Sequence, residues 1–101
     1  RIHALLQRMA EKDRYTAAIC AAPKVLLNAG LLDGRKATAY PGVIEGQLDP
    51  GVQLLADPVV TDGRVVTSKG PGTAMDFALT LIELLSGADT RQQVETPLMR
   101  P

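Results

Sequence analysis

The single cysteine of this sequence, Cys20, is the side chain best placed to act as a nucleophile. It follows a short apolar run, Tyr15-Thr-Ala-Ala-Ile19, and precedes Ala21-Ala22-Pro23, where the proline suits the first turn of a helix. A corner between a strand and a helix holds a side chain at the carboxyl edge of a sheet, where open α/β folds bind ligands. The helix N-terminus supplies backbone N–H donors and a positive dipole end, which favour the thiolate. We therefore predict a nucleophile elbow, with a cysteine where hydrolases place a serine.

The position of Cys20 alone also fits a plainer interpretation. Free cysteine is among the most frequently buried residue types, so a lone cysteine in an apolar stretch is often a small core residue. The choice between the two interpretations depends on the rest of the sequence.

The periodicity of the apolar residues predicts helices that alternate with strands. The strands are expected at 15–20 and 36–40, with a hairpin at 58–67 around Asp62-Gly63, the strongest hairpin signal in the chain. The helices are expected at 2–12, from Pro23 to about Leu32, at 74–86 and at about 89–95. Residues 43–57 are open between a short helix around 51–56 and an irregular segment.

Alternating strands and helices indicate an α/β fold with a mostly parallel sheet, to which the hairpin adds an antiparallel element. Three or four strands would leave one edge and part of one face open. The helical pattern also begins at once, at Ile2, without a capping residue. We therefore expect the chain to be part of a larger fold that a companion N-terminal segment completes.

Two blocks of sequence resemble one known family. Ala18-Ile-Cys-Ala-Ala-Pro23 resembles the elbow of the ThiJ/PfpI superfamily, of the DJ-one or Parkinson's-disease-protein-seven type. The segment that runs from Val66-Thr-Ser-Lys-Gly-Pro-Gly-Thr73 to Leu79 resembles a second block of that family. Because the order and spacing of the blocks also fit, residues 1–101 are identified as the C-terminal part of a single ThiJ/PfpI domain, of the class I glutamine amidotransferase-like kind.

The resemblance implies a flavodoxin-like three-layer α/β sandwich, usually a homodimer. It implies a glutathione-independent glyoxalase or protein deglycase that acts on methylglyoxal-type α-oxoaldehydes and early glycation adducts, in defence against oxidative and carbonyl stress. The single cysteine cannot form an internal disulfide, which fits a reducing compartment, so we expect the protein in the cytoplasm. Cys20 would be the nucleophile, and the Ala21 backbone N–H would help to hold the oxyanion. Neither a cofactor nor a metal is expected.

Two departures from the family pattern concern the catalytic partners of Cys20. The family's acid/base glutamate lies in the N-terminal half, and no glutamate of this chain falls in a matching motif: Glu11, Glu45, Glu83 and Glu95. We expect this carboxylate from the companion segment. The position of the histidine that some members carry is occupied here by Tyr40, before Pro41, which disfavours a Cys–His pair.

Two other functions stay open: a non-catalytic redox sensor or chaperone that signals through oxidation of Cys20, and an amidase or peptidase, which Tyr40 disfavours. His3 is read as an ordinary helix residue and Asp62 as a turn residue. The net charge of zero and the three aromatic residues give no indication of a nucleic-acid surface. One histidine and one cysteine give no metal-ligand pattern, and no apolar run approaches the length of a membrane span.

Overall fold

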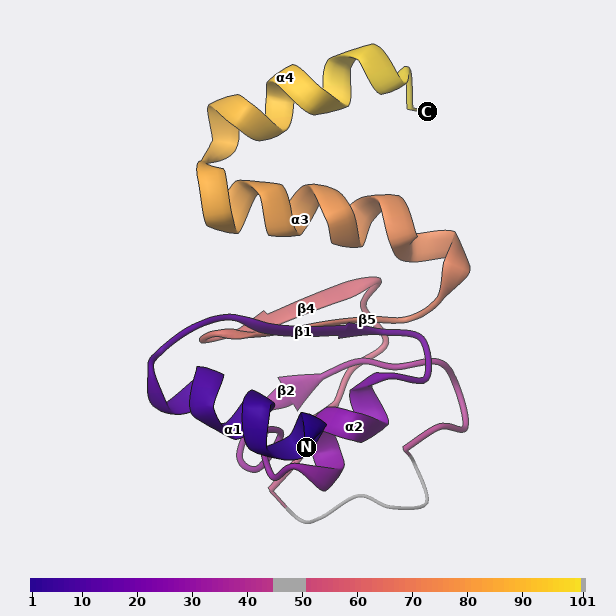
Figure 1. Cartoon of the computed structure of the whole chain (residues 1–101). Coiled ribbons are helices and arrows are strands. Elements are labelled where there is room, and N and C mark those ends of the chain that lie inside the picture. The colour runs from indigo at the N-terminus through magenta and orange to yellow at the C-terminus, as the bar shows by residue number, and fades with distance from the viewer. Residues whose placement is uncertain (45–50, 101) are drawn as a thin grey trace.

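A computed structural model describes residues 1–44 and 51–100 (Figure 1). A central sheet separates two helical layers: α1 and α2 lie on one side, and α3 with α4 outside it lies on the other. This is the three-layer α/β arrangement that the family resemblance implies. The elements, in chain order, are α1 (Ile2–Glu11), β1 (Thr16–Ile19), α2 (Pro23–Asn28), β2 (Lys36–Ala37), β3 (Gln53–Leu54), β4 (Val59–Asp62), β5 (Val65–Ser68), the 3-10 turn η2 (Pro71–Thr73), α3 (Ala74–Ser86) and α4 (Ala88–Leu98).

The main sheet has the strand order β1-β5-β4, with β1 at one edge. β1 pairs in parallel with β5, so that Thr16 lies opposite Val65 and Ile19 opposite Ser68. β4 pairs with β5 in the antiparallel direction, and β2 and β3 form a separate parallel pair. Two of the three pairings are therefore parallel, in agreement with the predicted mostly parallel sheet.

The predicted hairpin is confirmed, but its turn lies one residue later than the Asp62-Gly63 pair suggests. Asp62 still pairs with Val65, so the loop consists of Gly63 and Arg64. Gly63 has a φ of +60°, as a type II′ turn requires at its first loop position. Asp62 lies in β4, where its carboxylate accepts a hydrogen bond from the Lys36 N–H at 2.8 Å.

Three predicted elements differ from the structure. α2 ends at Asn28 and not near Leu32, because the chain turns at Gly30, which has a φ of +80°. The strand predicted at 36–40 is confined to Lys36–Ala37. The short helix considered around 51–56 is wrong, since Gln53–Leu54 form β3, while residues 45–50 of that segment lie outside the described part of the chain.

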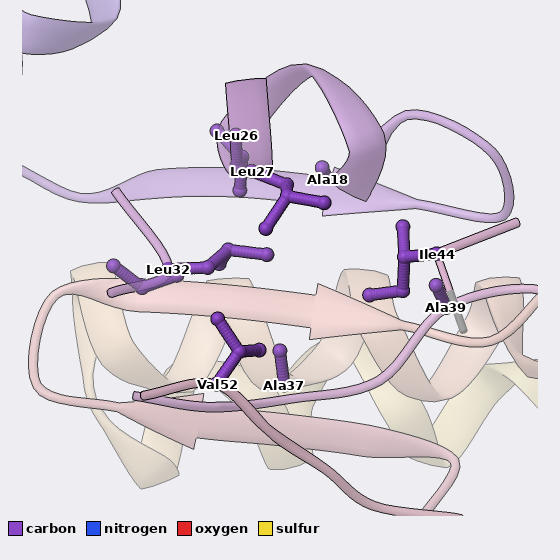
Figure 2. Packing of buried hydrophobic residues seen from close by; sticks show 9 residues of the cluster. Ala18, Leu26, Leu27, Leu32, Ala37, Ala39, Ile44 and Val52 are labelled. Atoms are coloured by element: carbon purple, nitrogen blue, oxygen red, sulfur yellow. The ribbon is translucent and has the colours of Figure 1, made fainter. Parts of the chain in front are cut away.

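One apolar cluster fills the space between the sheet and the α2 layer (Figure 2). Leu26 and Leu27 of α2 and Leu32 after it pack against Ala18 of β1 and Val65 of β5. Each buried leucine contributes about 1.5–3 kcal/mol relative to an exposed one. This packing fixes the position of α2 relative to the end of β1, and therefore positions the corner that carries Cys20.

The opposite face of the sheet is covered by α3. Successive side chains of a strand point to opposite faces, so Val66 lies on the other side of β5 from Val65. Val66 and Leu79 of α3 are both fully buried there. The predicted helix at 74–86 is confirmed to the residue, whereas the predicted last helix is longer than expected and extends to Leu98.

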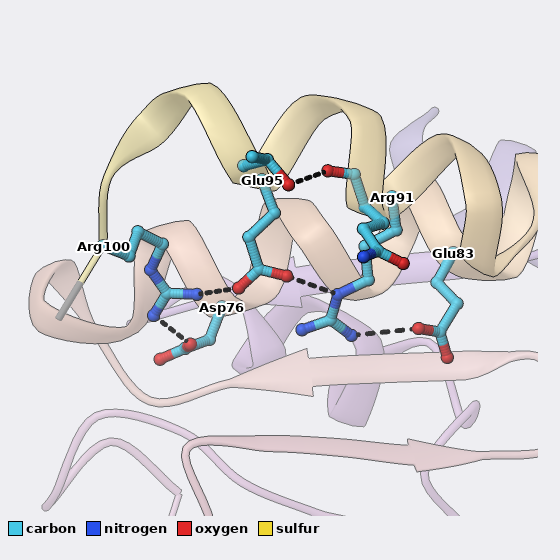
Figure 3. A network of polar contacts seen from close by, with 7 residues as sticks. Asp76, Glu83, Arg91, Glu95 and Arg100 are labelled. Carbon is cyan, nitrogen blue, oxygen red and sulfur yellow. Dashed lines mark hydrogen bonds and ion pairs between the residues drawn. The ribbon is translucent and has the colours of Figure 1, made fainter.

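α4 is joined to α3 by ion pairs and contributes no buried residue of its own (Figure 3). Arg91 contacts Glu83 and Glu95 at 3.2 and 3.3 Å, and Arg100 bridges Glu95 and Asp76. The pKa of Arg91 is raised: partial burial opposes its charge, but the hydrogen bonds and charges of the two glutamates outweigh that effect. The helix is therefore attached through charged groups and not through an apolar face.

Within the described residues, no helix is both long enough and apolar enough to cross a lipid bilayer.

Candidate active site

Cys20 occupies the corner that follows β1, and its backbone is in the left-handed region, with a φ of +64°. This conformation is uncommon for a residue with a side chain and costs about 1–2 kcal/mol. Such strain persists only where the surrounding structure enforces it, and it occurs frequently at functional sites. The geometry matches that of a nucleophile elbow, in which the side chain is held out at the end of a strand.

Two backbone hydrogen bonds hold the strained residue. The Cys20 N–H donates to the Ser68 carbonyl at 3.0 Å, which continues the pairing of β1 with β5 by one residue. The Cys20 carbonyl accepts from the Tyr40 N–H at 2.8 Å. The corner is therefore fixed by two segments that are distant in sequence, one after β2 and one at the end of β5.

The second sequence block forms a tight turn beside this corner. The Ser68 hydroxyl lies 2.7 Å from both the Pro58 carbonyl oxygen and the Thr73 hydroxyl oxygen, and it can donate its one proton to either. The Thr73 hydroxyl also accepts from the Gly70 N–H at 3.1 Å and donates to the Gly70 carbonyl at 2.9 Å. These bonds make the carboxyl end of β5 rigid, and thus stabilise the carbonyl that holds Cys20.

Tyr40 lies on this turn as well as beside the cysteine. A Cβ atom built on Gly70 would lie 3.2 Å from Cδ1 of the Tyr40 ring, so the ring rests directly on the glycine. The side chain of Tyr40 is half exposed. Cys20, Tyr40 and the turn at 68–73 therefore meet at one edge of the molecule.

The chain after Cys20 leaves room at the elbow. Ala21 and Ala22 are small and exposed, and α2 begins at Pro23. Among the described residues, no acceptor takes a hydrogen bond from the Ala21 N–H, whereas the Ala22 N–H donates to the Ile19 carbonyl at 3.1 Å. An N–H without an acceptor next to a nucleophile is available to stabilise developing negative charge.

Sequence reasoning identified Cys20 and Tyr40 but not their supports. Ser68 enters only as part of a family block. Gly70-Pro71-Gly72 predicts a turn and Thr73 a cap of the next helix, but the Thr73 hydroxyl makes no cap hydrogen bond and bonds Gly70 instead. The signal that could have found them is a run of hydroxyl residues and glycines directly after a β-branched strand, since such a run forms turns that are bonded by side chains.

The remaining chemically active side chains of the described residues do not gather at the elbow. His3 is exposed on α1, Glu11 is exposed at the end of that helix, and Asp62 pairs with Arg35. Glu83 and Glu95 belong to the ion pairs of α3 and α4. Glu45 lies outside the described residues. Within residues 1–44 and 51–100, no group of three or more histidine, cysteine or acidic residues could hold a metal ion.

One known family matches the part of the sequence that forms the elbow and its supports. The sequence model of the DJ-1/PfpI family matches residues 1–84, which contain both the elbow and the turn at 68–73. The chain belongs to the DJ-1/PfpI family. Its structure is accordingly the α/β sandwich of the DJ-1 proteins, as the solved structures below also show.

Several curated proteins are similar in sequence. The chain is 44% identical to protein dj-1beta of Drosophila melanogaster, over 94% of this chain and 51% of that protein. It is 38% identical to the glutathione-independent glyoxalase DJR-1.2 of Caenorhabditis elegans, over 93% of this chain and 50% of that protein. It is 33% identical to a deglycase of Pyrococcus horikoshii, over 80% of this chain and 49% of that protein.

Two solved structures are similar in fold. The crystal structure of DJ-1beta from Drosophila melanogaster superposes with a TM-score of 0.90 at 39% identity, over 99% of this chain and 54% of that one. Oxidized DJ-1 of Toxoplasma gondii gives a TM-score of 0.86 at 36% identity, over 96% of this chain and 52% of that one. The chain thus spans about half the length of these relatives.

Proposed function

We propose that this chain carries the reactive cysteine of a glutathione-independent glyoxalase or protein deglycase that acts on methylglyoxal-type α-oxoaldehydes. The observation that carries the proposal is the strained elbow at Cys20, held between the Ser68 carbonyl and the Tyr40 N–H. Relatives named as a glyoxalase and as a deglycase support the same chemistry. No cofactor is required in the proposed reaction.

The proposed reaction begins when the Cys20 thiolate adds to the aldehyde carbon and forms a hemithioacetal. The Ala21 N–H, exposed beside the cysteine, stabilises the oxyanion that develops. A carboxylate then removes the proton from the former aldehyde carbon and returns it to the neighbouring carbon, which converts the adduct into a thioester. Water cleaves the thioester, so that the hydroxy acid and the thiol are released with no net oxidation or reduction.

The experiment for this function compares serine substitutions at Cys20 and at Ala22, two residues later. Cys20→Ser should abolish formation of lactate from methylglyoxal in the intact protein, because a serine without an adjacent base is a far weaker nucleophile. Ala22→Ser places the same side chain in the same exposed turn and should retain activity. Undiminished turnover in Cys20→Ser would refute the covalent mechanism.

We also propose that a companion N-terminal segment covers the open edge of β1 and supplies the acid/base carboxylate. β1 is the outer strand of the described sheet, and a cavity of about 650 Å³ lies beside it, lined in part by Ala17, Leu81 and Leu85. The exposed apolar side chains Ile2 and Leu5 of α1 are a second surface that such a segment could cover. The chain's span of about half its relatives leaves room for that segment.

Amide hydrogen exchange along β1 tests, residue by residue, whether a companion segment pairs with this strand. The Thr16 N–H donates to the Arg64 carbonyl just before β5, and the Cys20 N–H donates to the Ser68 carbonyl at its end. By the alternation of a parallel strand, the N–H groups of Ala17 and Ile19 point toward the open edge. The Ala17 and Ile19 amides should exchange quickly in residues 1–101 alone and slowly in the complete protein. Thr16 and Cys20 are the internal controls and should be protected in both. Equal protection of all four amides in the isolated chain would exclude a strand at this edge.

We also propose a homodimer, which the family resemblance implies, and a cytoplasmic location, which the single cysteine supports. Sedimentation of the complete protein at micromolar concentration should give twice the monomer mass. A monomer under those conditions would overturn the dimer, and secretion of the tagged protein would overturn the location.

The second candidate function is a redox sensor, and the oxidized Toxoplasma gondii relative favours it. Cys20 is a free thiol that is partly exposed at the elbow. After mild peroxide treatment, mass spectrometry should find sulfinate at Cys20 before sulfoxide at Met99, which is 85% exposed and thus a demanding reference. Earlier oxidation of Met99 would indicate that exposure alone governs reactivity.

The peptidase alternative has the weaker support, because the chain's single histidine lies on α1 and Tyr40 occupies the position beside Cys20.

A further inference from the structure

We propose a second site, for a phosphate-type dianion, at the end of the sheet opposite to Cys20. A cavity of about 280 Å³ lies there, where β1 and β5 begin. Three arginines from three separate segments line it: Arg14 after α1, Arg35 before β2 and Arg64 in the β4–β5 turn. The sequence does not reveal this group, since the arginines belong to no common motif.

Arg35 is fixed in place by the hairpin. Its Nη1 donates to the Asp62 carbonyl at 3.0 Å and lies 3.7 Å from the Asp62 carboxylate. The same nitrogen lies against Gly63, where a Cβ atom would approach it to 2.7 Å. Only part of the five-donor guanidinium is used by these contacts, so the group is held in position while other N–H donors stay available.

Arg64 is positioned from the other side of the cavity. Its guanidinium lies over the Tyr15 ring, 4.7 Å from the ring centre, and its Nε is 3.6 Å from the Asp13 carboxylate. Asp13 itself has a left-handed backbone, with a φ of +56°, which ends α1 and turns the chain toward Arg14. Arg14 makes no ion pair with any described residue. Arg14 and Arg64 also line the larger cavity beside β1, so the proposed companion segment would lie next to the anion site.

An unpartnered hydroxyl is the second sign of a polar ligand. Thr16 lines the cavity and is 96% buried, since only 4% of its surface is exposed. Its Oγ1 has no hydrogen-bond partner among the described residues. A buried hydroxyl without a partner is unfavourable, and an anion bound in the cavity that Thr16 lines would supply the missing acceptor.

The charge around the cavity determines the kind of ligand. The three guanidinium groups face two carboxylates, those of Asp13 and Asp62, so one positive charge is in excess in a chain whose formal net charge is zero. Arginine forks match the oxygens of a phosphate, with which they form charge-assisted, bidentate hydrogen bonds. A phosphate or phosphomonoester presents more acceptor oxygens than a planar carboxylate, and presents them in a tetrahedral arrangement, so it can accept from guanidinium groups on different sides of the cavity.

The anion site is separate from the cysteine site. Thr16 and Cys20 lie at the two ends of β1, about 13 Å apart at the usual rise of a strand. A ligand in the cavity would contact α1, Arg35 before β2 and the hairpin together, and would stabilise their arrangement without reaching the nucleophile.

Titration of the intact protein with inorganic phosphate, at constant ionic strength maintained with sodium chloride, tests the proposal. Backbone NMR shifts should saturate at residues that line the cavity, and methyl phosphate should bind similarly to inorganic phosphate whereas acetate should bind at least about tenfold more weakly. In Arg14→Gln/Arg64→Gln, which leaves the structural Arg35 in place, the affinity for phosphate should fall at least about tenfold.

Arg8→Gln is the matched control, because Arg8 is an exposed arginine of α1 outside the cavity. Its affinity for phosphate should equal that of the unaltered protein. Urea unfolding checks that both variants remain folded. The site is overturned if the shifts do not saturate, if acetate binds as well as phosphate, or if Arg8→Gln weakens binding as much as the double variant.

Discussion

Because the backbone of Cys20 is strained, we predict that glycine at this position gives a larger free energy of unfolding than alanine does. Cys20→Ala removes the sulfur but keeps a Cβ atom in the left-handed region, at a φ of +64°. Cys20→Gly removes the sulfur and the strain. The relief of about 1–2 kcal/mol exceeds the extra entropy that glycine gives to the unfolded chain, about 0.4–1 kcal/mol.

The expected difference is therefore roughly 0.5–1 kcal/mol in the free energy of unfolding, with the glycine variant more stable than the alanine variant. Urea unfolding of the complete protein, followed by circular dichroism, measures it as a shift in the midpoint at unchanged slope. Comparison of two variants that both lack the sulfur removes the contribution of sulfur contacts from the result.

Ala21→Gly is the matched control in the next residue, whose backbone is not in the left-handed region. There glycine should lower the free energy of unfolding, by about 0.4–1 kcal/mol relative to alanine. The two sites thus predict opposite signs. A glycine variant at Cys20 that is less stable than the alanine variant, as at Ala21, would refute the strained elbow.

Two further predictions concern polar groups away from the elbow. The Thr67 hydroxyl accepts a hydrogen bond from the buried Thr38 N–H at 2.9 Å. Thr67→Val removes this acceptor and should lower the free energy of unfolding by about 1–3 kcal/mol. The control, Thr61→Val on the exposed side of β4, should change the free energy of unfolding by less than about 0.5 kcal/mol. Equal effects of the two threonine variants would contradict the hydrogen bond. Raising the salt concentration to about 1 M should speed amide exchange in α4, because salt screens the partly exposed ion pairs that attach this helix. Arg100→Gln removes two of these ion pairs and should therefore reduce the effect of salt on the exchange rate. A salt response unchanged in Arg100→Gln would show that the ion pairs do not hold the helix.

The sequence predicts best those elements whose signal is local. The periodic apolar residues of 74–86 predict α3 because helix formation and burial of Leu79 demand the same spacing. The strand before Cys20 follows from a short apolar run, and the hairpin follows from two β-branched runs around an Asp-Gly pair, although its turn lies one residue later.

The sequence predicts least where tertiary contacts override local preference. β3 is only two residues long and exists because Gln53 and Leu54 align with β2, which no pattern within 51–56 reveals. The apolar spacing predicts that α2 continues to Leu32, but the helix ends at Asn28 because the chain turns at Gly30. Leu32 is still buried in the core, from the segment that follows this turn. At the elbow, the type of residue and its place at a strand end were predictable, but the bonds from Ser68 and Tyr40 depend on the pairing of distant segments.

The parallel pairing of β1 with β5 also determines when the elbow can form during synthesis. The Cys20 N–H donates to the Ser68 carbonyl, so the whole segment from Cys20 to Ser68 must be synthesised and folded back before this bond can form. Parallel pairing of distant strands is slow, because the entropy of closing the intervening loop is lost before the contacts form. A nascent chain therefore carries an unpositioned thiol until the hairpin docks against β1, and reactivity of Cys20 would report on completion of the sheet.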